Sequence, residues 1–111
     1  SRIFFALLQA SASELAARIT RGDDFDLVDV REPAEWAIAR IEGARLVPLA
    51  TIADASADWD RSREVVLYCK SGVRSMHAAE QLARNGFTNV TNVAGGIVGW
   101  TNDVDPSLAR Y

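Results

Sequence analysis

The sequence predicts an α/β domain with a mainly parallel sheet, and three observations support this. Short apolar segments typical of strands alternate with segments typical of helices, an order that favours α/β layers. Residues 64–68 form the clearest strand, apolar on both faces as expected of a central strand in a covered sheet. A chain of 111 residues has the usual size of one domain and can bury a core without disulfides or metal.

Local signals place the elements in order. A helix capped by Ser11 or Ser13 is expected to end near Gly22. Pro33 suits a first helical position ahead of a short helix. The expected strands are 25–30, 45–47, 64–68 and 90–93, and the apolar segment 3–8 is the candidate for the first strand. The expected helical segments after the first are 35–39, 49–57, 75–85 and 97–102.

Composition narrows the classes of partner. The net charge is −3 and the pI is about 5.0, so neither nucleic acid nor an anionic membrane is an expected partner. No apolar run approaches the roughly 20 residues of a membrane-spanning helix. A single cysteine allows no internal disulfide and no Cys/His cluster, which indicates a reducing, cytoplasmic location and neither metal nor cofactor. The chain begins at Ser1 rather than Met, so we expect a domain cut from a longer protein or one that has lost its initiator methionine.

Cys69 is the best candidate for a nucleophile. It directly follows the strand 64–68 and opens the segment Cys69-Lys70-Ser71-Gly72-Val73-Arg74-Ser75, where the next helix begins. A helix N-terminus carries about half a positive charge, and together with a nearby cation it lowers the pKa of a cysteine. Gly72 allows the loop amides to point inward as an anion-binding nest, and the two loop serines add hydroxyl donors.

The spacing of the loop indicates which group it holds. Four residues lie between Cys69 and Arg74, one fewer than in cysteine-dependent phosphatases. The shorter loop makes a tighter pocket, suited to a terminal sulfur on the cysteine rather than to a tetrahedral phosphate. The plainer interpretation of a lone cysteine is a small buried hydrophobe, and that of Arg74 is a surface arginine at the start of a helix.

The chain resembles a rhodanese domain over nearly its whole length. Two departures are Ala39-Arg40, where many rhodaneses carry Gly-His, and an opening segment 3–8 that is more apolar than expected. The segments that carry the resemblance are Asp29-Val30-Arg31-Glu32-Pro33 with Glu35-Trp36, Ile41-Glu42-Gly43-Ala44, Val47-Pro48-Leu49, the loop Cys69 to Ser75, Gly86-Phe87, and Gly95-Gly96-Ile97 with Trp100.

The resemblance implies a single domain over 1–111, a five-stranded sheet with helices on both faces, and a sulfurtransferase. Cys69 would take a sulfur atom from thiosulfate or a protein persulfide, such as that of a cysteine desulfurase, and carry it as a cysteine persulfide. Arg31 would face the same pocket. The residues implied in substrate binding are Lys70, Ser71, Gly72, Val73, Arg74, Ser75 and Arg31, and those implied in structural support are Asp29, Gly95 and Gly96.

A narrower resemblance concerns the partners. The chain is similar to the rhodanese domains at the C-terminus of E1-like adenylyltransferases. The similarity lies in the sequence of the loop Cys69 to Ser75, the segment Gly95 to Trp100, and the tail from Val104 to Tyr111. In that subgroup the acceptor is the adenylated Gly-Gly tail of a ubiquitin-like sulfur carrier, for molybdopterin or related sulfur incorporation. An adenylyltransferase domain is therefore an implied partner.

Several alternatives stay open at this point. The runner-up enzyme is a small cysteine-dependent phosphatase or arsenate reductase of related fold, and a third possibility is a non-catalytic rhodanese-fold interaction module. Asp29 would either pair with an active-site arginine or hold the turn at the strand end, and the second is preferred. Arg31 is balanced between the pocket wall and a surface salt bridge. His77 is interpreted as an ordinary helix residue, because an ionised thiol needs no general base.

Overall fold

The computed structural model describes residues 7–111. The candidate strand 3–8 therefore lies mostly outside the described residues, although a first strand is present from Leu7. In chain order the elements are β1 Leu7–Ala10, α2 Ala12–Thr20, β2 Asp26–Asp29, α3 Pro33–Ile38, β3 Arg45–Leu46, the 3-10 helix η1 Leu49–Thr51, α4 Ile52–Ala55, β4 Val65–Tyr68, α5 Val73–Arg84, β5 Val90–Val93 and α6 Gly96–Asp103.

The sheet has five parallel strands in the order β1-β5-β4-β2-β3, which confirms the predicted class. The central strand β4 pairs with β2 through Val28 opposite Leu67 and with β5 through Leu67 opposite Asn92. All four residues of β4 are buried. In parallel sheets ligands bind beyond the carboxyl ends of the strands, so this topology places Cys69 at the centre of that edge.

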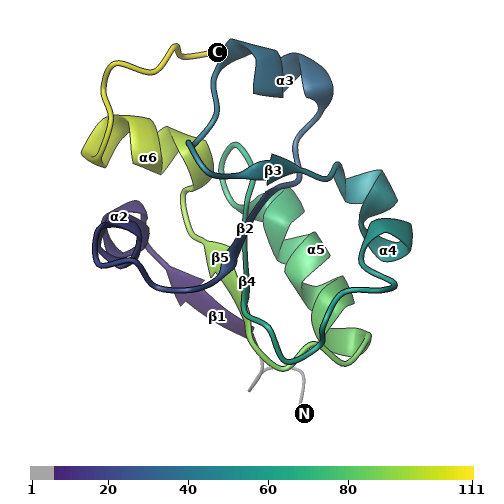
Figure 1. Cartoon of the computed structure of the whole chain (residues 1–111). Helices are drawn as coiled ribbons and strands as arrows, with labels where there is room; N and C mark the ends of the chain where they lie inside the picture. The colour runs from purple at the N-terminus through teal and green to yellow at the C-terminus, as the bar shows by residue number, and fades with distance from the viewer. Residues whose placement is uncertain (1–6) are drawn as a thin grey trace.

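Each face of the sheet has its own core. Alternate residues of β4 point to opposite faces: Val65 and Leu67 pack with α4 and α5, whereas Val66 and Tyr68 pack with Leu15 of α2 and Ile97 of α6. Figure 1 shows α2 and α6 on one side of the sheet and α4 and α5 on the other. The predicted covering on both faces is therefore confirmed.

Local chemistry explains where the helices begin. Ser11 is the residue that caps α2, because its hydroxyl accepts from the Glu14 amide at 3.1 Å while Glu14 accepts from the Ser11 amide at 2.9 Å. Pro33 occupies the first turn of α3, as predicted. The predicted start of α5 at Ser75 is wrong by two residues. Gly72 adopts a left-handed φ of 107° and caps the helix there, so the helix begins at Val73.

Candidate active site

Cys69 lies directly beyond β4, at the N-terminal end of α5. Only 1% of its surface is exposed. Its sulfur accepts hydrogen bonds from the Gly72 amide at 3.1 Å and from the Ser75 hydroxyl at 3.3 Å. Donors that converge on a sulfur atom stabilise its negative charge, so the loop is organised around a thiolate.

Two opposing effects set the acidity of this thiol. Burial raises the pKa of Cys69, because a thiolate loses hydration there. The Ser75 hydroxyl and the backbone amides of Ser75, Gly72 and Ser71 lower it by hydrogen bonding to the anion. The hydrogen bonds prevail, and the pKa of Cys69 lies below the ordinary thiol value. The thiolate is therefore more abundant at neutral pH than in a free cysteine.

The backbone of the loop is fixed to α6. The amides of Ile97 and Val98 donate to the carbonyls of Cys69 and Lys70 at 2.9 and 3.1 Å. This close approach requires glycine at position 96, because a Cβ atom there would lie 2.5 Å from both carbonyl oxygens. Gly95 caps α6 in a left-handed conformation with a φ of 82°. The two glycines thus allow one helix N-terminus to hold the loop that surrounds the sulfur.

Arg74 is directed to a carboxylate rather than to the sulfur. Its terminal nitrogens donate to the two oxygens of Glu35, on α3, at 2.6 and 2.9 Å. Arg74 lowers the pKa of Glu35 to about 2 despite partial burial, with the phenol of Tyr111 as a further donor at 2.6 Å. Arg74 therefore links the start of α5 to α3, and the donors that reach the sulfur are the Gly72 amide and the Ser75 hydroxyl.

Arg31 is fully buried and paired with Asp29. Its guanidinium donates to both oxygens of Asp29, to the carbonyl of Ala39 at 2.7 Å and to the phenol of Tyr111 at 2.8 Å. Asp29 also accepts from the Arg31 amide at 2.9 Å, so it combines the arginine pairing with the strand-end turn. In this arrangement the guanidinium of Arg31 is not exposed to a pocket, and its implied contact with substrate stays a prediction.

The other loop residues lie at the rim. Lys70 is half-buried, with its ammonium 4.4 Å from the centre of the Tyr111 ring. Ser71 and Val73 are exposed and line a shallow cavity of about 380 Å³ on the β5 side of the loop. His77 is exposed on the same side. The structure therefore holds the six predicted binding residues of the loop next to Cys69, although the Arg74 guanidinium is hydrogen-bonded to Glu35 rather than to the sulfur.

Sequence reasoning missed two residues that support the loop. Glu35 was seen only as part of a motif, and Asn92 was not singled out. The Asn92 amide, 2% exposed, donates to the Gly72 carbonyl at 3.3 Å and to Gln9 at 3.1 Å. A usable signal was available: Asn92 is the penultimate residue of β5 and Glu35 lies in the helix that follows β2, and the carboxyl ends of both strands meet at the edge that carries Cys69.

Residues 7–111 contain no group of three or more His, Cys, Asp or Glu side chains arranged to hold a metal ion. In the same range no helix is long and apolar enough to cross a membrane.

Comparison with known proteins agrees with this geometry. The family model of the rhodanese-like domain matches residues 11–103, and the chain belongs to this family. It is 38% identical, over 88% of its length, to a probable adenylyltransferase/sulfurtransferase MoeZ of Mycobacterium tuberculosis, of which it covers 26%. It is 35% identical to a sulfurtransferase of Allochromatium vinosum, with 91% of the chain and 94% of that relative aligned. The crystal structure of a rhodanese-like domain protein from Staphylococcus aureus superimposes with a TM-score of 0.80 at 30% identity, over 94% of this chain and 98% of that one.

Proposed function

We propose that this domain is a persulfide-forming sulfurtransferase with Cys69 as its nucleophile. The observation that carries the proposal is the sulfur of Cys69, which accepts from Gly72 and Ser75 inside a closed loop of amides. Two relatives that this chain covers over 94% of their length, one named a sulfurtransferase and one a putative sulfurtransferase, support the same reaction class.

The first half-reaction loads the enzyme. The Cys69 thiolate attacks the outer sulfur of thiosulfate, a new S–S bond forms, and the bond to the sulfonate sulfur breaks so that sulfite leaves with the electron pair. With a protein persulfide as donor, the leaving group is the donor's thiolate. The loop amides that lower the pKa of Cys69 then stabilise the negative charge on the transferred sulfur.

With a nucleophilic acceptor, the second half-reaction returns the thiolate directly. The acceptor attacks the outer sulfur of the persulfide, and Cys69 leaves as an anion in the same hydrogen-bonded position. No general base is needed at this step because no proton is removed from the sulfur. For cyanide the product is thiocyanate, which makes the complete cycle measurable with small molecules.

The acceptor we propose is the adenylated C-terminus of a ubiquitin-like sulfur carrier. Support comes from the loop and tail motifs and from the relative named adenylyltransferase/sulfurtransferase, of whose length this chain spans about a quarter. In this reaction the terminal persulfide sulfur attacks the acyl adenylate, AMP leaves, and an acyl disulfide to Cys69 forms. An outside thiol then attacks the Cys69 sulfur so that the thiocarboxylate leaves. A second outside thiol reduces the resulting mixed disulfide and restores the Cys69 thiol, because residues 7–111 contain no second cysteine.

Loop geometry favours sulfur transfer over phosphate ester hydrolysis. Four residues lie between Cys69 and Arg74, and this short loop favours a single terminal sulfur bonded to Cys69 over a tetrahedral phosphoryl group bonded there. In addition, Glu35 holds the guanidinium of Arg74 through two hydrogen bonds, whereas phosphate recognition uses a free bidentate fork.

The test is thiosulfate-to-cyanide sulfur transfer by wild type and Cys69→Ser. We expect thiocyanate formation by the wild type and loss of it in the variant, with unchanged folding by circular dichroism. Full activity in Cys69→Ser would overturn the mechanism. Hydrolysis of an aryl phosphate by the wild type but not by Cys69→Ser would instead support the phosphatase alternative.

A further inference from the structure

The three cations predicted around Cys69 differ in what balances their charge. Arg31 and Arg74 are paired with Asp29 and Glu35. Among residues 7–111 no carboxylate forms a salt bridge with Lys70. The Lys70 ammonium lies instead over the ring of Tyr111, so its positive charge is available to an incoming anion.

Tyr111 is itself fixed by the residues beneath the site. Its hydroxyl accepts from the guanidinium of Arg31 at 2.8 Å and donates to Glu35 at 2.6 Å. Its ring also lies 5.6 Å from the guanidinium carbon of Arg31. Two hydrogen bonds, one to the loop after β2 and one to α3, hold this phenol in place, although it belongs to a tail without helix or strand.

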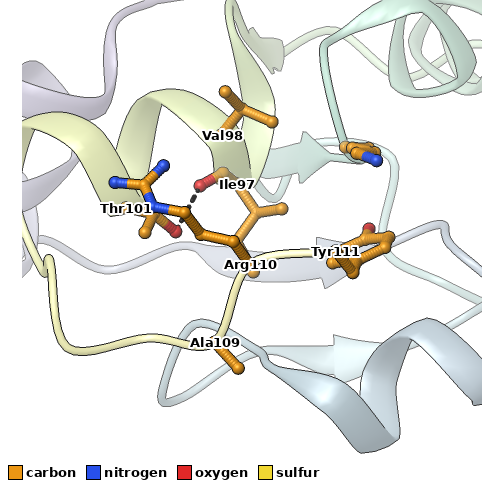
Figure 2. Close-up of a pocket in the computed structure, with 7 residues that line it drawn as sticks. Ile97, Val98, Thr101, Ala109, Arg110 and Tyr111 are labelled. Carbon is orange, nitrogen blue, oxygen red and sulfur yellow. Dashed lines mark hydrogen bonds between the residues drawn. The ribbon is translucent and has the colours of Figure 1, made fainter.

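The tail forms one wall of a cavity beside the loop. This cavity has a volume of about 200 Å³ and lies between α6 and the last three residues. Figure 2 shows Tyr111 and the Arg110 guanidinium toward opposite ends of it, with Ile97 and Val98 of α6 between them. Ile97 is the residue whose amide holds the Cys69 carbonyl, so the cavity adjoins the loop directly.

We propose that Tyr111 is a positioning residue that holds the Lys70 ammonium at the rim of the Cys69 loop and thereby selects anionic reactants over neutral ones. The relevance of this selectivity to sulfur transfer rests on the proposed function. The selectivity itself is a property of the folded domain and can be measured by alkylation of Cys69, without sulfur transfer.

The experiment compares alkylation of Cys69 by iodoacetate, an anion, and by iodoacetamide, its neutral analogue. The single cysteine gives one reaction per chain. In Tyr111→Leu, we expect the ratio of the iodoacetate rate to the iodoacetamide rate to fall about 2- to 5-fold, the size of one exposed cation–π contact. A general loosening of the loop or a changed thiol pKa alters both rates together and leaves the ratio unchanged.

Lys70→Met and the double variant identify the residue through which Tyr111 acts. We expect Lys70→Met to lower the ratio at least as much, and Tyr111→Leu to cause no further fall in that background. An unchanged ratio in Tyr111→Leu, or an equal additional fall in the double variant, would overturn the proposal. If Tyr111→Leu does not fold, the alkylation ratio of Lys70→Met still tests whether Lys70 favours anionic reagents.

Thiosulfate kinetics then connect this selectivity to the proposed reaction. We expect Tyr111→Leu to raise KM for thiosulfate about 2- to 5-fold with little change in kcat, because the contact acts on the approach of the anion. A fall in kcat at constant KM would contradict a role in selecting the donor. A wild type without sulfur transfer but with the expected alkylation ratios would remove the proposed function and leave the role of Tyr111 intact.

Discussion

Arg74 donates from both terminal guanidinium nitrogens to the two carboxylate oxygens of Glu35, at 2.6 and 2.9 Å. This pair joins the first turn of α5, which surrounds the reactive sulfur, to α3 across 39 residues of sequence. The sequence predicts that Arg74 binds the anion held by the loop, and the structure pairs its guanidinium with Glu35.

Glu35→Gln should therefore destabilise the domain by about 1.5–3 kcal/mol at neutral pH, the range for hydrogen bonds to charged groups. Because the folded state holds the pKa of Glu35 at about 2 instead of 4.5, the pair contributes fully above pH 4.5 and loses its contribution as the pH falls toward 2. Urea unfolding across this window should show wild type and variant converging at low pH. Glu42→Gln, at an exposed position, is the control, and a constant difference at all pH values would contradict the assignment.

Ser75→Ala tests the origin of the thiol acidity. The change removes the hydroxyl that donates to Cys69 at 3.3 Å, and the pKa of the thiol should rise by about half a unit to one unit. The pH dependence of the iodoacetamide reaction reports this pKa directly. Ser71→Ala is the matched control, since the Ser71 side chain is exposed and only its backbone amide lowers the pKa of Cys69. Equal shifts in both variants would refute the hydroxyl's role.

Gly96→Ala should disturb the contact between α6 and the loop. The added Cβ meets the carbonyl oxygens of Cys69 and Lys70 at 2.5 Å, at a φ of 54°. Gly22→Ala is the control, because it has a φ of 75° with nothing within 4 Å and so reports left-handed strain alone, about 1 kcal/mol. We expect a larger loss of unfolding free energy for Gly96→Ala, measured in urea. Equal losses would mean that the loop relaxes around the added methyl group.

Arg31→Met should lower the stability of the folded domain more than removal of a surface arginine does. It leaves the carboxylate of Asp29 buried without its partner, which costs about 3–5 kcal/mol. Arg63→Met removes a more exposed pair with Asp24 and Asp26 and should cost less than about 1 kcal/mol. The thermal midpoints of the two variants measure the difference. Similar midpoints would show that the buried pair adds no more than a surface one.

The parts of the structure with local signals were predictable. Alternating apolar segments established the sheet and its covering helices, and the loop from Cys69 to Ser75 is contiguous in sequence. The start of α5 was placed too late because the left-handed cap at Gly72 depends on the fold around it. Ser11 and Ser13 were equally plausible caps until the reciprocal bond to Glu14 decided between them.

Side-chain contacts between residues far apart in the chain could not be predicted from the sequence. Tyr111 meets Glu35 across 76 residues, and no pattern in either segment indicates this contact. The orientation of the Arg31 side chain could not be predicted from the sequence. Asp29 lies only two residues away, but only the folded structure shows that the guanidinium is buried and faces this carboxylate rather than a ligand. The sequence therefore could not show which of the cations near Cys69 are paired with carboxylates, because both pairings depend on the fold.

Persulfide formation on Cys69 is tested most directly by the intact mass of the protein after incubation with thiosulfate and removal of excess donor. We expect a gain of one sulfur atom on the wild type, lost on treatment with cyanide, and no gain on Cys69→Ser. An unmodified wild type whose thiol is shown to be free beforehand would contradict the persulfide mechanism.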